Sequence, residues 1–181
     1  MLPIGRRPDL SCLGRREVAH EGLLDHAGVL ARSILFGLPA RAASHHIPRV
    51  VYAEPELAQV GLTEAEARAA HGAALTVIRQ EFAHNDRAQA MGEAEGFLKL
   101  MVLKGRPVGV TLVGPQTGEL IGLWALALSA RLKLAAVAGM VAPYPTLTEI
   151  SKRAAGAYFS PKLFANPWVK RGVRLVQRLL P

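Results

Sequence analysis

Short apolar runs in the middle of the chain predict strands, and polar positions between them predict turns. Residues 49–53, 75–82, 97–103 and 108–113 are brief runs rich in Val, Ile, Leu and Phe. The last two flank a Lys-Gly-Arg-Pro sequence at residues 104–107, whose glycine and proline indicate a hairpin turn. Helical patterns precede and follow these runs. We therefore expect an α+β fold, with an antiparallel sheet packed with helices.

Two helix starts are marked by a threonine followed three residues later by a glutamate. Thr63 and Glu66 predict a capped helix that ends near His71. Thr146 and Glu149 predict a second helix of the same kind, in which each side chain of the pair caps a backbone N–H of the other. Its apolar face would be formed by Ile150, Ala154 and Ala157.

Residues 119–133 predict a long helix that is apolar nearly all round. A surface helix has one apolar face, so this helix must be covered on two sides. One side can meet the sheet, and the other is expected to meet another subunit, because large exposed apolar patches mark interfaces. The alternative is a helix buried entirely within its own domain.

Tyr144 stands between Pro143 and Pro145, just before the second capped helix. Each proline fixes its own φ and keeps the preceding residue out of the helical region, so the phenol is held extended and presented. With Glu149 in the first turn of the helix, this segment has the makings of a site. The alternative is a plain connection in which Glu149 only caps the helix.

Composition indicates one compact domain with tails and limits its chemistry. The 181 residues are 50% hydrophobic with a mean hydropathy of +0.20, enough to bury a core. The single Cys12 excludes an internal disulfide and a Cys-pair redox centre. No Gly-x-Gly-x-x-Gly follows a strand, so the chain alone is not expected to bind FAD or NAD(P)H tightly. No histidine has the neighbours of a metal ligand, so no metal site is predicted.

Basic residues are concentrated at the C-terminus of a chain whose net charge is +8. Seven follow Glu149 without an acid: Lys152, Arg153, Lys162, Lys170, Arg171, Arg174 and Arg178. Residues 167–181 predict a basic amphipathic helix suited to an anionic membrane surface, with Trp168 as an anchor. The alternative is a helix that packs its apolar face on the domain. Specific nucleic-acid binding is not expected, because no reading motif is present.

Residues 144–149, Tyr-Pro-Thr-Leu-Thr-Glu, resemble the His-Pro-Thr-x-x-Glu signature of the pyridine nucleotide-disulfide oxidoreductases. This family includes dihydrolipoamide dehydrogenase, glutathione reductase and mercuric reductase. Residues 47–67 resemble the opening of the family's C-terminal dimerisation domain, and residues 96–100 fit between the two segments. The resemblance covers residues 20–160. Tyr144 stands where the family usually has histidine, as in the mercuric-reductase-like branch.

The N-terminal residues resemble pieces of the same family with a gap between them. The Gly-Arg-Arg-Pro sequence within residues 2–10 resembles the crossing from the NAD(P) domain back to the FAD domain, and residues 27–36 resemble a later helix. The flavin-binding turn that would separate them is missing, which indicates an internal deletion around residues 15–21. We divide the chain into residues 1–46, a remnant of the FAD domain with its connecting helix; residues 47–160, the dimerisation domain; and residues 161–181, the basic tail.

The resemblance implies a homodimer in which each subunit completes the other's active site. Tyr144 and Pro145 would face the FAD of the partner, Tyr144 would bind or orient the substrate, and Glu149 would orient the acid/base residue. The parent enzyme would pass a hydride from NAD(P)H through FAD to an acceptor. This chain would be inactive alone.

Tyr144 and the single cysteine limit which substrates the parent enzyme is expected to reduce. A phenol titrates near pH ~10, whereas an imidazole titrates near neutral pH, so Tyr144 is a poor base for a thiol. This argues against a reaction with lipoamide or glutathione. Cys12 alone argues against mercury as the substrate, since soft metals require thiolates. The alternative function is a stand-alone dimerisation and membrane-tethering module. No signal peptide is evident, which favours a cytoplasmic protein, peripheral at the inner face of the membrane if the tail binds it.

Overall fold

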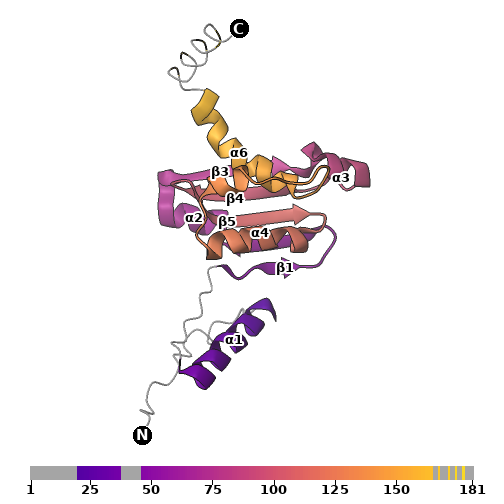
Figure 1. The fold of residues 1–181 in the computed structure, drawn as a ribbon. Coiled ribbons are helices and arrows are strands. Elements are labelled where there is room, and N and C mark those ends of the chain that lie inside the picture. The colour runs from indigo at the N-terminus through magenta and orange to yellow at the C-terminus, as the bar shows by residue number, and fades with distance from the viewer. Residues whose placement is uncertain are drawn as a thin grey trace.

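Five antiparallel strands form the centre of the computed structural model, which describes residues 20–37 and 46–164 and positions 167, 171, 174 and 177. The strands are β1 (Arg49–Val51), β2 (Glu56–Gly61), β3 (Leu75–Glu81), β4 (Phe97–Leu103) and β5 (Arg106–Gly114). Their order in the sheet is β1-β2-β5-β4-β3, and each neighbouring pair is antiparallel (Figure 1). The predicted α+β fold with an antiparallel sheet is confirmed.

The hairpin between β4 and β5 forms where glycine and proline predicted it. Leu103 pairs with Arg106, so the loop consists of Lys104 and Gly105 alone. Their φ angles are 49° and 77°, and two-residue hairpin loops favour positive φ because such turns match the twist of the strands. Glycine at the second position meets this requirement without strain.

Strand β2 was not predicted from the sequence. Its residues include three that are poor strand formers, Glu56, Ala58 and Gly61, and one β-branched residue, Val60. The strand forms because it pairs on both sides, with Gln59 opposite Arg49 of β1 and opposite Thr111 of β5. Hydrogen bonds to two neighbours therefore outweigh a weak local preference.

Two helices pack on one face of the sheet, a third packs against one of these two, and a fourth packs on the other face (Figure 1). The first two are α4 (Thr117–Ser129) and α6 (Glu149–Phe164), and the third is α5 (Leu134–Ala138), which packs against α6. They cover the main core, whose largest fully buried side chains include Trp124, Phe82, Leu98, Leu100, Leu112 and Ile150. On the other face, α2 (Glu64–His71) buries Ala67 against Leu75 and Met101.

Helix α2 begins with the predicted capping box. Thr63 N donates to Glu66 Oε2 at 2.8 Å, and Glu66 N donates to Thr63 Oγ1 at 3.3 Å. The backbone hydrogen bond from Thr63 lowers the pKa of the Glu66 carboxyl, because it stabilises the charged form. The helix ends at His71, as predicted.

The helix predicted over residues 119–133 is shorter, and this correction has a local cause. Helix α4 ends at Ser129, and Arg131 has a φ of 51°. Leu132 N then donates to Ala127 O at 2.9 Å, and Arg131 N donates to Leu128 O at 3.1 Å. This is a Schellman ending with arginine in the left-handed position usually taken by glycine, so the sequence carries no obvious stop signal. The chain then enters α5, which was not predicted.

The polar residues 84–88, between two predicted strands, were expected to form a turn. They contain instead the start of a short helix, α3 (Asp86–Met91). Asn85 caps it, since its Oδ1 accepts from Ala88 N at 3.0 Å. Ala88 is the buried residue of this helix, and a single buried position gives no helical period in the sequence. Single 3₁₀ turns lie at Gly72–Ala74 and Phe82–His84.

The predicted helix before the domain is present as α1 (His20–Phe36). The predicted basic tail, residues 167–181, lies largely outside the described residues, as does Cys12. No helix in the described ranges is both long enough and apolar enough to cross a membrane.

Candidate functional site

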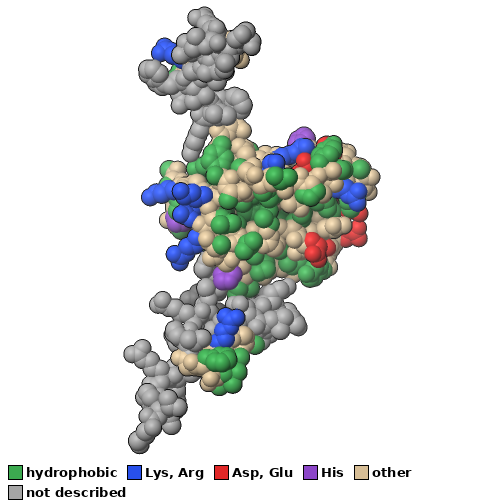
Figure 2. All heavy atoms as spheres, viewed as in Figure 1, with side chains coloured by type: hydrophobic (Ala, Val, Ile, Leu, Met, Phe, Trp, Pro, Cys, Tyr) green, Lys and Arg blue, Asp and Glu red, His purple; other side chains and the backbone are tan. Residues whose placement is uncertain are grey.

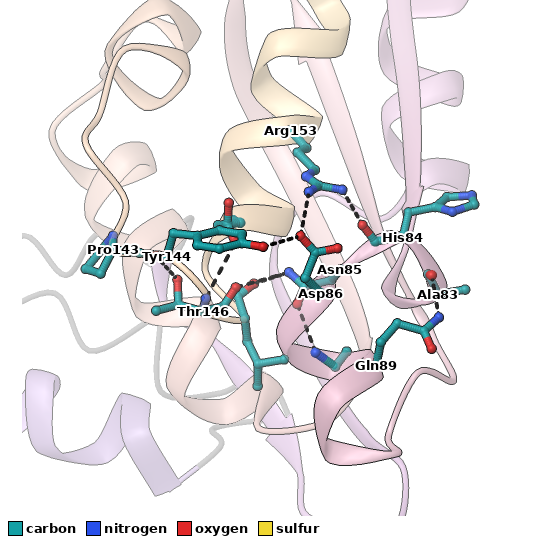
Figure 3. Close-up of polar contacts among 12 residues, drawn as sticks. Ala83, His84, Asn85, Asp86, Gln89, Pro143, Tyr144, Thr146 and Arg153 are labelled. Carbon is teal, nitrogen blue, oxygen red and sulfur yellow. Dashed lines mark hydrogen bonds and ion pairs between the residues drawn. The ribbon is translucent and has the colours of Figure 1, made fainter.

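The segment between α5 and α6 carries Tyr144 on the surface of the domain. Its side chain is 71% exposed, as the flanking prolines predict. The phenol hydroxyl donates to Asp86 Oδ2 at 3.0 Å, so the ring lies over the start of α3 (Figure 3). These two residues are 58 positions apart in the sequence. Pro145 beside it is also exposed.

Arg153 of α6 joins the same carboxylate. Its Nη2 lies 3.8 Å from Asp86 Oδ2, and its Nη1 donates to the backbone carbonyl of His84 (Figure 3). The hydrogen bond to Asp86 and the negative charge of this residue raise the pKa of the Tyr144 phenol, with a smaller contribution from Glu149, while Arg153 opposes the shift. Tyr144 is therefore a protonated phenol at neutral pH.

Asn85 anchors the backbone that follows Tyr144. Its side chain is 1% exposed, and its Nδ2 donates to Thr146 O at 3.1 Å and to Leu147 O at 3.4 Å. Because the same side chain caps α3 through Oδ1, it fixes the start of α3 against the start of α6. Tyr144 and Asp86 are thus held in place by their backbones as well as by their own hydrogen bond.

Glu149 is the first residue of α6, and its carboxylate makes half of the predicted capping box. Oε2 accepts from Thr146 N at 3.5 Å. The Thr146 hydroxyl does not cap Glu149 N. It donates to Pro143 O at 2.7 Å, and Glu149 N donates to Thr146 O at 3.4 Å. The expected reciprocal box is therefore corrected to a one-sided cap, because the loop backbone competes for the threonine hydroxyl. The proposed role of Glu149 in orienting an acid/base residue stays a prediction.

The sequence reasoning did not single out Asp86 or Arg153. Both lie in ordinary polar surroundings in the sequence, and nothing local marks a partner so far along the chain. The sequence signal that was available is Asn85, a preferred N-cap residue, followed directly by the acidic Asp86, which together indicate that a helix starts at Asp86.

The sheet of the described residues differs in type from the sheet of a dinucleotide-binding fold. Dinucleotide folds use parallel strands with a glycine-rich turn before a helix, whereas all the described strand pairs are antiparallel. Within residues 20–37 and 46–164, no three His, Cys, Asp or Glu side chains gather as a metal site. What the Tyr144 group offers chemically is a fixed, protonated phenol and the charged pair of Asp86 and Arg153.

A second surface feature is the outer face of α4, which we define by Gly122, Leu123, Leu126 and Ser129. The inner positions Ile121, Trp124 and Leu128 are buried, while Leu126 is 60% exposed and Leu123 is half-buried. Figure 2 shows hydrophobic side chains gathered on the surface of the domain where α4 lies in Figure 1. The helix is apolar on both sides, as the sequence predicted.

Two solved structures contain the same fold. LpdA from Mycobacterium tuberculosis superposes with a TM-score of 0.65 and 26% identity, over 71% of this chain and 28% of that protein. A copper(II) complex of the HOCl-induced flavoprotein disulfide reductase RclA from Escherichia coli superposes with a TM-score of 0.69 and 25% identity, over 74% of this chain and 31% of that protein.

Curated relatives are dihydrolipoyl dehydrogenases. One from Chlorobaculum parvum is 37% identical over 147 residues, which is 80% of this chain and 31% of that protein. Another, from Bacillus subtilis, is 32% identical over 139 residues, or 76% of this chain and 30% of that protein. The chain thus spans about a third of its relatives' length. Residues 47–155, more than half of the chain, match the family of the pyridine nucleotide-disulphide oxidoreductase dimerisation domain, and the chain belongs to that family.

Proposed function

We propose that this chain is the C-terminal dimerisation domain of an FAD-dependent NAD(P)H oxidoreductase, that it forms a homodimer, and that its Tyr144 segment completes the partner subunit's active site. The observation that carries the proposal is the anchoring of an exposed phenol. Tyr144 is 71% exposed, and its hydroxyl is nevertheless held at 3.0 Å by Asp86. A polar group fixed on a surface in this way is ready to meet a second surface.

The outer face of α4 supports the homodimer. Leu126 and Gly122 are exposed, and Leu126 is a large apolar side chain that water does not stabilise. A two-fold axis beside this helix would pack the face against its copy, as a self-complementary interface requires. The absence of a side chain at Gly122 would allow the two helices to approach closely.

The flavin in this proposal belongs to parts of the parent enzyme outside the described residues. When bound, FAD supplies hydride transfer from NAD(P)H to an acceptor. The contribution of this chain is to place Tyr144 and Pro145 at the edge of that site, to exclude water there, and to hold the phenol in a fixed direction. Glu149 would support the segment through its bond to Thr146 N.

The tyrosine favours a mercuric-reductase-like branch over a lipoamide-type reaction. A thiol substrate needs a base, and Asp86 raises the pKa of the Tyr144 phenol further from neutral pH. The proposed role of Tyr144 is therefore to bind or orient the substrate that accepts electrons from the flavin, through hydrogen bonds. A cytoplasmic location is part of this proposal, and cell fractionation tests it.

The alternative proposal is a stand-alone dimerisation module without catalytic activity, tethered to a membrane by residues 167–181. It rests on the concentration of positive charge after Glu149. Binding to vesicles containing anionic lipid, compared with a variant that lacks residues 167–181, tests it. Equal binding by the two proteins would contradict tethering.

Light scattering on the purified chain, with an absorbance scan of the same peak, tests the main proposal. We expect the mass of a dimer. Leu126→Lys should convert the dimer to a monomer, because two buried lysines would face each other across the axis. The matched control is Leu57→Lys, which adds the same charge at an exposed leucine of β2. A monomeric wild-type chain, or equal effects of the two variants, would contradict the interface.

A further inference from the structure

Three side chains from separate parts of the chain meet around one carboxylate oxygen. Asp86 Oδ2 accepts from the Tyr144 hydroxyl at 3.0 Å and lies 3.8 Å from Arg153 Nη2. Tyr144 comes from the segment before α6, Asp86 from the first turn of α3, and Arg153 from the second turn of α6 (Figure 3).

Contacts outside the group hold the Arg153 side chain and the backbone segments that carry Tyr144 and Asp86. Arg153 Nη1 donates to the carbonyl oxygen of His84, which fixes the guanidinium beside the turn that leads into α3. The neighbouring Asn85 bonds to Thr146 O and Leu147 O, which fixes α3 against the segment that carries Tyr144. The direction of the carboxylate is therefore set before any ligand or partner arrives, which is the condition for a preorganised site.

The number of hydrogen bonds that a phenol can donate and accept determines what Tyr144 can bind in this geometry. A tyrosine hydroxyl has one proton to donate, and an ionised carboxylate can only accept. Because the Tyr144 hydroxyl donates its proton in the hydrogen bond to Asp86, only the lone pairs of its oxygen are left to bind a second partner. The exposed side of the phenol oxygen is thus a hydrogen-bond acceptor.

We propose that Asp86 is a positioning residue that fixes Tyr144 as a hydrogen-bond acceptor, and that the group meeting Tyr144 in the assembled site is a hydrogen-bond donor. A protonated thiol, an N–H group or a water molecule fits this requirement, whereas a carbonyl oxygen or a thiolate does not. This inference rests on the proposed function, since it assigns the class of ligand group for the same site.

The titration of Tyr144 in the full chain tests the role of Asp86 without flavin or substrate. Ultraviolet absorbance follows the phenols, and Tyr144→Phe identifies the contribution of Tyr144 among the three tyrosines. The groups that bear on this phenol are Asp86 and Glu149, which raise its pKa, and Arg153, which lowers it. We expect Asp86→Asn to lower the midpoint of Tyr144. Glu93→Gln, which removes an exposed charge just after α3, should leave it unchanged.

Infrared spectra of protein with ¹³C at the phenolic carbon test the direction of the hydrogen bond. The C–O stretch of a phenol differs between a hydroxyl that donates and one that only accepts, and Asp86→Asn should move the band assigned to Tyr144. Asp86→Ala, which removes the carboxylate and places a strong helix former at the first position of α3, serves if the asparagine variant does not fold. An unchanged midpoint and an unchanged band in a folded variant would overturn the proposal.

A failure of the proposed function and a failure of the positioning role of Asp86 can be told apart. A monomeric chain would remove the proposed dimer, and the titration of Tyr144 would still report on Asp86. A dimer whose Tyr144 titrates equally with and without Asp86 would keep the proposed function and remove the positioning role.

Discussion

The indole N–H of Trp124 donates to the Ser151 hydroxyl at 3.0 Å, deep between α4 and α6. Both residues are almost fully buried, at 0% and 1% exposure. The bond joins the helix that carries the proposed interface to the helix that follows Tyr144. It therefore connects the two surface features that the proposed function uses.

Removing this bond should destabilise the domain. Ser151→Ala leaves the indole N–H buried without its acceptor, which is expected to cost about 1–3 kcal/mol of unfolding free energy. Urea denaturation followed by circular dichroism measures the change. Ser160→Ala is the matched control, because Ser160 is exposed in the same helix, and it should stay within about 0.5 kcal/mol of the wild type. Equal losses in the two variants would contradict the structural role of the bond.

Replacing Asn85 should lower the free energy of unfolding more than replacing Ser151, because the Asn85 side chain both donates hydrogen bonds and caps α3. Asn85→Ala removes the cap of α3 and both bonds to the backbone at Thr146 and Leu147, with an expected cost of about 2–3 kcal/mol. Asn85→Asp keeps an acceptor for the cap but places a carboxylate against two carbonyl oxygens.

The aspartate variant gives the sharper test of Asn85. Its stability should improve as the pH falls, because the introduced carboxyl group can donate a hydrogen bond once it is protonated. Unfolding curves at several pH values measure this, with the wild type as the reference for general acid effects. A variant whose loss relative to the wild type does not change with pH would show that the donor role is unimportant.

Local signals in the sequence explain which parts of the fold could be predicted. The capping box at Thr63 and the hairpin at Gly105 depend on residues within a few positions, and both were predicted. The loop of the hairpin is shorter than the predicted residues 104–107, because Arg106 and Pro107 pair within β5. Strand β2 and the end of α4 depend on distant pairing and on Arg131 taking a left-handed conformation, so local patterns did not reveal them. The contact of Tyr144 with Asp86 is of the same non-local kind.

Gly96 should not tolerate a side chain. Its φ is 109°, and a Cβ atom would lie 2.0 Å from the carbonyl oxygen of Val113 in the neighbouring strand. We expect Gly96→Ala to cost at least about 2 kcal/mol, from backbone strain and the displacement of β5. Gly156→Ala is the control, because nothing lies within 4 Å of its Cβ position in α6, and it should stabilise the helix by about 0.5–1 kcal/mol. Thermal unfolding of the two variants checks the opposite signs.

The hydrogen bond between Tyr144 and Asp86 should appear in the pH dependence of stability. Asp86 raises the pKa of the folded-state phenol above its ordinary value of about 10, so the folded chain holds this proton more tightly than the unfolded chain does. The resulting stabilisation is fully present below pH ~10 and is lost as the pH rises through the folded-state pKa. Unfolding free energies of the wild type and of Tyr144→Phe should therefore converge at alkaline pH. Taking the difference between the two proteins removes the titration of lysines, which both contain. A difference that stays constant through the alkaline range would mean that Asp86 does not hold the phenolic proton in solution.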